Sequence, residues 1–175
     1  MTQTSSISDT PLRTGNPQAN ALADRLEQGA QALITFASTL TDAEWRMPLS
    51  LKDGRPIGVI VHHVASVYPI EIQLAQNVAN GQAITGVTSR DIDTMNAKHA
   101  SEHAGVTKAE TLEFLRRNSA EAAAAIRALA DEQLRQAAPV SLYEDAPLTS
   151  QFVLEDHAVR HSYHHLFLIR RALGR

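Results

Sequence analysis

Residues 149–174 read TSQFVLEDHAVRHSYHHLFLIRRALG and carry four of the eight histidines of the chain. On a wheel of about 100° per residue, three apolar side chains fall within about 20° of His161: Leu154, Leu168 and Ala172. The segment is therefore predicted to be an amphipathic helix that begins near Thr149 or Ser150 and ends at Gly174, a good C-cap. A histidine lies at the centre of its apolar face.

Three further segments repeat an apolar residue every three or four positions, as amphipathic helices do. They run from about Asn16 to Leu40, from Pro56 to Asn80, and from the capping box at Thr107 to Leu129. We also expect a short helix from Asp91 and, over residues 134–147, a connection without strands. These patterns predict an all-α, up-down four-helix bundle over residues 17–175, with one or more long connections and a flexible tail at residues 1–16.

Composition excludes several classes of protein. The chain has no cysteine, which rules out disulfides, thiolate metal sites and a cysteine nucleophile. Its net charge is −3 and its basic residues are scattered, so no nucleic-acid partner is expected. We find no secretory signal and expect no window apolar enough to span a bilayer. A cytoplasmic protein with no membrane partner is the resulting expectation.

The eight histidines fall into three groups: His62 and His63, His99 and His103, and His157, His161, His164 and His165. Residues four apart on a helix project the same way, so both His157/His161 and His161/His165 could share one ion. In the second predicted helix, His63 has apolar neighbours and is expected to face the core, whereas His62 lies on a mixed face. We expect His62 and His164 not to be ligands. His99 and His103 lie in a segment without an apolar stripe and are interpreted as a solvated face.

Several neutral imidazoles on one apolar seam cannot all find backbone partners, and a divalent cation would accept their lone pairs. The sequence thus predicts a metal site formed by His63, His161 and His165. Zinc is the first expectation, and nickel, manganese or iron also suit imidazole. The alternative is that these histidines are hydrogen-bonded core residues, which is the commoner role of a single inward histidine.

Two of these motifs resemble the DinB-like (DinB/YfiT) superfamily of inferred metalloenzymes, which includes thiol-dependent S-transferases and mycothiol-dependent maleylpyruvate isomerase domains. Residues 57–65, IGVIVHHVA, resemble the family's second helix, with His63 in the place of its metal histidine. Residues 161–165, HSYHH, match the two histidines four apart in its last helix. An Arg-Gly-Gln often follows there, and this chain has Leu166-Phe167-Leu168 instead.

The resemblance covers the chain from about Ala19 to the end. Residues 93–97, DTMNA, are also similar to a family stretch near the site, which implies that Asn96 approaches it. The resemblance implies a metal-dependent enzyme that transfers a low-molecular-weight thiol to an electrophilic small molecule. The same site would serve equally for hydrolysis of a small molecule by a metal-bound water.

Two classes of function remain open from the sequence. In an enzyme, the metal would activate water or a thiol in an open position, with His157 or His164 as a proton shuttle. In a binding or scaffold protein, the metal would be structural or absent, and His157 or His164 could close the site as a fourth ligand. A DNA-contacting regulator is disfavoured by the net acidity. A homodimer is the expected assembly.

Overall fold

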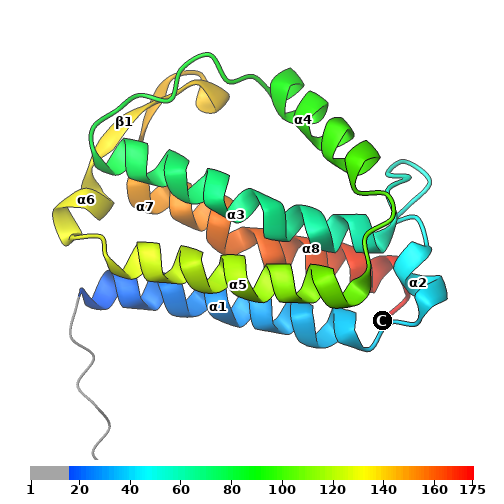
Figure 1. Cartoon of the computed structure of the whole chain (residues 1–175). Coiled ribbons are helices and arrows are strands. Elements are labelled where there is room, and N and C mark those ends of the chain that lie inside the picture. The colour runs from blue at the N-terminus through cyan, green and yellow to red at the C-terminus, as the bar shows by residue number, and fades with distance from the viewer. Residues whose placement is uncertain (1–15) are drawn as a thin grey trace, which may run out of the picture.

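Four long helical segments form the body of the protein in the computed structural model, which describes residues 16–175. They are α1 (Pro17–Ser38), α3 (Ile57–Ala79), α5 (Lys108–Arg127) and a C-terminal run of α7 (Ser150–Val153), the π-helix η2 (Leu154–Val159) and α8 (Arg160–Ala172). Figure 1 shows them side by side, with α1 packed against α5 and α8, and α3 against α5 and the C-terminal run. The predicted four-helix bundle is confirmed. The tail expected for residues 1–16 lies outside the described residues, except for Asn16, whose side chain caps α1.

The long connections set the direction of the helices. Helix α2 (Asp42–Arg46) carries Trp45, whose Nε1 donates to the carbonyl of Val106 just before α5 begins, 3.1 Å away. The same indole covers Gly58 in the first turn of α3, where a Cβ would lie 2.3 Å from the ring. Helices α3 and α5 therefore begin at the same end of the bundle and run parallel. The chain returns to that end through α4, which follows α3 and precedes α5 in the sequence (Figure 1).

Helix α4 (Ser89–Glu102) begins earlier than the sequence predicted. Thr88 and Asp91 form a capping box, in which each side chain accepts from the other residue's backbone N–H. None of the residues of α4 is buried, and the helix lies across the outside of α3 (Figure 1). It is less tightly packed than the four long segments and forms one wall of the site described below.

The expectation of no strands was wrong. After α6 (Asp131–Arg135), β1 (Ala137–Val140) pairs antiparallel with β2 (Ala146–Thr149), and the short 3₁₀ helix η1 (Ser141–Tyr143) lies between them. Pro139 lies opposite Pro147, and proline inside a run argues against a strand in any reading of the sequence. The backbone N–H of Ile84 donates to the carbonyl of Pro139, which fastens the hairpin to the loop after α3.

Helix α3 also contradicts the expectation that no segment is apolar enough to span a membrane. Its 23 residues pass that test by length and composition, yet 67% of its apolar window is buried inside the bundle. The helix is apolar nearly all round because neighbours cover most of its surface, as in the core helix of a globular domain.

Candidate metal centre

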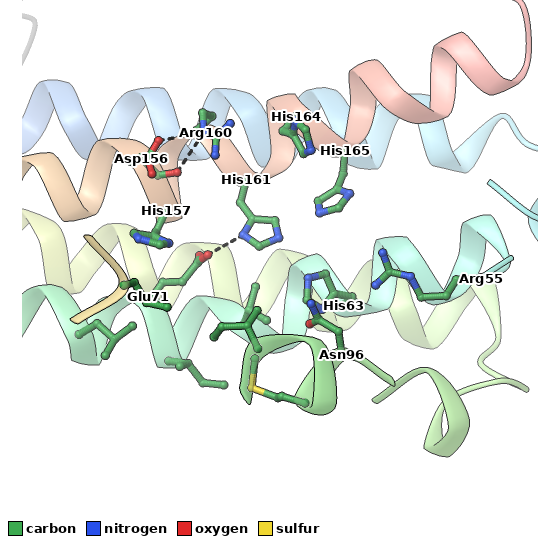
Figure 2. A pocket seen from close by; sticks show the side chains of 16 residues that line it. Arg55, His63, Glu71, Asn96, Asp156, His157, Arg160, His161, His164 and His165 are labelled. Carbon is green, nitrogen blue, oxygen red and sulfur yellow. Dashed lines mark hydrogen bonds and ion pairs between the residues drawn. The ribbon is translucent and has the colours of Figure 1, made fainter. Parts of the chain in front are cut away.

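Three histidines from two helices meet in the interior between α3 and α8 (Figure 2). His63 comes from α3, and His161 and His165 lie one turn apart on α8. One ring nitrogen from each lies within 4.8 Å of the others. His63 is 6% exposed and His165 is 8% exposed. The structure thus brings together the three residues that the sequence proposed as ligands, and metal binding by them stays a prediction.

The two remaining candidates from the last helix line the same cavity but do not join this cluster. His157 lies in the π-helix η2, whose wider turn breaks the 100° spacing assumed for His157 and His161. Its Nε2 instead lies 3.2 Å from the hydroxyl of Tyr143, which also donates to Asp156. His164 is exposed and packs edge-on against the ring of His165, with centroids 5.2 Å apart.

Glu71 was missed in the sequence and is the closest partner of the cluster. Its Oε1 lies 2.5 Å from Nδ1 of His161, and only 6% of the residue is exposed. A carboxylate accepts, so His161 donates through Nδ1 and keeps the lone pair of Nε2 for a ligand. The signal available was a single acid between Ile70 and Ile72, two helical turns after His63, because a buried acid needs a partner.

The polar atoms of the cluster fit a cation. Nε2 of His161 and Nδ1 of His165 are buried and have no hydrogen-bond partner within residues 16–175. Burial, and to a smaller extent the neighbouring His161, lowers the pKa of His63 to about 3 and that of His165 to about 2. Both rings are therefore neutral at pH 7, and unprotonated imidazole nitrogen is the form that binds zinc and related metals.

A cavity of about 400 Å³ opens onto the three histidines. One wall comes from α4, through Ile92, Met95 and Asn96, and Arg55 and Arg160 also line the cavity. Asn96 lies beside His63 in Figure 2, and its Oδ1 is buried without a partner. Asn96 therefore reaches the site, as the sequence resemblance implied.

Arg55 supplies a fixed positive charge at this cavity. Its Nε and Nη2 donate to the two carboxylate oxygens of Asp53, at 2.8 and 2.7 Å. This two-point contact holds the guanidinium plane, while Nη1 is buried and has no partner. This group could not be predicted from the sequence, because Arg55 lies in a loop without periodicity.

A second histidine cluster contradicts the interpretation of His99 and His103 as a solvated face. They lie at the end of α4 and meet His62 of α3, so that one nitrogen from each of the three rings is within 4.8 Å of the others. Nδ1 of His62 is 2.9 Å from Nε2 of His99. All three rings are half-buried. The helical spacing correctly predicted that His62 and His63 lie on different faces of α3. It could not predict that α4 packs beside the face that carries His62.

The chain is an all-α helical bundle with a histidine-lined cavity between facing helices, which is where helix bundles build metal and cofactor sites. Residues 25–169 match the sequence profile of the DinB superfamily, and the chain belongs to this family. No curated protein sequence matches significantly.

Two solved structures show the same fold. YfiT from Bacillus subtilis, described as a probable metal-dependent hydrolase with an unusual four-helix bundle topology, superposes with a TM-score of 0.70 at 16% identity, covering 94% of this chain and 93% of that one. The mycothiol-dependent maleylpyruvate isomerase superposes with a TM-score of 0.63 at 12% identity over 86% of this chain. This chain spans only 60% of the isomerase chain.

Proposed function

We propose that this protein is a metal-dependent enzyme that acts on a small molecule, with one divalent cation held by His63, His161 and His165. The observation that carries the proposal is the pair of buried, unpartnered nitrogens on His161 and His165, aimed at the same space as His63 and backed by Glu71. A divalent metal held there would lower the pKa of a water or thiol and supply a nucleophile near neutral pH.

The residues around the cluster support catalysis more than a closed structural site. Within residues 16–175 only three histidines converge on it, and a structural zinc site needs four protein ligands. The cavity volume suits a small molecule. A scaffold with a structural metal, the alternative function, would need His157 or His164 to turn into the cluster.

Each polar group of the cavity has a distinct task in this proposal. Nη1 of Arg55 orients an anionic group of the substrate, since a buried guanidinium N–H without a partner is a strong site for a carboxylate. His157 holds its Nε2 proton toward the Tyr143 oxygen, which leaves Nδ1 free to accept a proton from the reacting group. His164, exposed at the cavity mouth, is the second candidate for proton exchange with solvent.

Water and a low-molecular-weight thiol are the two nucleophiles that this site could use. The structural likeness to a probable hydrolase supports the first, and the likeness to a mycothiol-dependent enzyme supports the second. Zinc is the proposed metal, with nickel, manganese or iron as alternatives. We also propose a cytoplasmic location, which the absence of cysteine supports, and a homodimer.

The first test is the metal content of protein purified without an affinity tag, by elemental mass spectrometry. Zinc bound at the buried centre should be lost in His63→Ala, His161→Ala and His165→Ala, and retained in His164→Ala, the matched control on α8. Turnover of ester substrates, and of thiols with electrophiles, should then be compared in the wild type and Arg55→Gln. Retention of the buried metal in all three alanine variants would contradict the proposal.

A further inference from the structure

The cluster of His62, His99 and His103 joins two helices that have few other contacts. His62 belongs to α3, His99 lies in the last turn of α4, and His103 is the residue that caps the C-terminus of α4. The rings of His62 and His103 stack with centroids 4.2 Å apart, and those of His99 and His103 are 4.6 Å apart. Three nitrogen donors therefore meet where α4 crosses α3.

Hydrogen bonds within the protein do not satisfy these rings. The contact of 2.9 Å between His62 and His99 uses one proton and one lone pair, and Nδ1 of His99 is buried without a partner. No carboxylate within residues 16–175 forms a hydrogen bond with any of the three rings. Glu110 and Glu113 line the same pocket as His62 and His103 without such a contact, and Glu102 pairs with Lys98 at 3.8 Å. Three imidazoles grouped without a hydrogen-bonded carboxylate are a donor set for a divalent cation.

We propose that His62, His99 and His103 form a second divalent-metal site, which fastens α4 to the bundle. Zinc–nitrogen bonds of about 2.0–2.1 Å in a tetrahedron place two nitrogens about 3.3 Å apart. The His62 and His99 nitrogens need to separate by only about 0.4 Å to reach this spacing. The site takes a borderline-soft cation of the zinc type, with water completing the coordination.

Occupancy of this second site acts on the first cavity through α4. Met95, one turn before His99, lines that cavity together with Asn96 and Ile92. Since α4 buries none of its own residues, a metal at its C-terminal end would supply the hold that apolar packing does not. The bound metal thus keeps the α4 wall of the cavity in place.

The inference does not rest on the proposed function, because the two clusters share no ligand. Zinc is titrated into tag-free protein, excess is removed by gel filtration, and the bound metal is counted by elemental mass spectrometry. We expect two equivalents in the wild type, one in His165→Ala, one in His103→Ala and none in the double variant. His99→Ala repeats the test, and Lys98→Ala, an exposed neighbour on α4, should keep two.

Zinc retained at one equivalent in the wild type and absent in His165→Ala would overturn the second site and leave the first intact. The reverse result, with one equivalent in His165→Ala and none in His103→Ala, would support the second site and remove the buried one. Hydrogen exchange gives an independent readout: added zinc should slow exchange of α4 amides in His165→Ala at least several-fold, and have no effect on them in His103→Ala. Equal protection in both variants would also overturn the proposal.

Discussion

Two histidine clusters lie on neighbouring faces of one helix, and they differ in what surrounds them. His63 and His62 are neighbours on α3, about 100° apart, so that one faces α8 and the other faces α4. The first cluster is buried, has a carboxylate bound to one of its rings and opens into a cavity. The second is half-buried and has no acid hydrogen-bonded to it within the described part of the chain. The contrast fits the two proposals made above, a catalytic metal at the first cluster and a structural metal at the second.

The two neighbours on α3 allow the most direct test. We expect His63→Ala to lose the metal of the buried centre and keep that of the second cluster, and His62→Ala to do the reverse, because each ring serves one cluster. Bound zinc counted by elemental mass spectrometry, together with hydrogen exchange in α4, distinguishes the two. Loss of the same single equivalent in both variants would mean that one ion is shared, since the rings of His63 and His99 are only 5.5 Å apart between centroids.

Glu71 should matter for one cluster alone. A carboxylate that accepts from a ligating imidazole orients the ring and strengthens its lone pair, and its loss typically weakens metal binding by about 10–100-fold. We expect Glu71→Gln to weaken zinc binding at the buried centre by about this factor. The measurement is competition with a chromophoric chelator in a His103→Ala background, so that only the buried site is titrated.

Gln73→Ala is the matched control, because Gln73 is exposed on the same helix two residues away. It should leave the affinity for zinc unchanged. An equal loss in both variants would show that Glu71 acts through the fold of α3 and not through His161.

The sequence predicted the buried centre better than the second cluster for a geometric reason. His161 and His165 depend only on local helical spacing, and His63 only on which face of α3 is apolar, so periodicity was enough. His62 and His99 are 37 residues apart, and their meeting depends on where a loosely packed helix comes to rest. Nothing in the polar pattern of α4 predicts that position.

In the fold as well, the features set by local periodicity were predictable and the irregular ones were not. The four long helices follow from their apolar stripes, and capping residues mark several of their starts. The π-helix η2 displaces His157 through one local departure from α geometry, which a wheel with fixed angles cannot represent. The hairpin of β1 and β2 could not be recognised in the sequence, because Pro139 and Pro147 lie within its strands and proline disfavours a strand. Departures from regular geometry limited the prediction most where they shape the cavity.

In the metal-free protein, the two clusters should differ in how strongly they make the free energy of unfolding depend on pH. Burial holds the pKa of His63 at about 3 and that of His165 at about 2, below the ordinary value of 6.5. The unfolded chain binds more protons below pH 6.5, so the free energy of unfolding falls as the pH falls from 6.5. Between pH 6.5 and 5 each buried ring should cost about 1–2 kcal/mol.

Urea unfolding with a chelator at pH 7 and pH 5 measures this loss. His165→Leu should remove about half of it. His62→Ala should remove less, because the second cluster is half-exposed and water screens its charge, although desolvation and the neighbouring His103 and His99 lower the pKa of His62 to about 4. A larger effect from His62→Ala than from His165→Leu would reverse the assignment of the buried, acid-sensitive centre.

The smallest expected effect concerns the cost of keeping a metal site without its metal. Nδ1 of His165 is buried without a partner, and such an atom costs about 1–3 kcal/mol. His165→Leu removes it, so we expect the metal-free protein to gain about 1 kcal/mol in the free energy of unfolding at pH 7, after some loss from imperfect packing.

With zinc at about 100 times the dissociation constant the wild type should gain about 2.7 kcal/mol at this centre and become the more stable protein. His103→Leu at the second cluster should change the metal-free value by less than about 0.5 kcal/mol, because its ring is half-exposed. A destabilised, metal-free His165→Leu would mean that His165 is held by packing that leucine cannot reproduce, and not kept for a ligand.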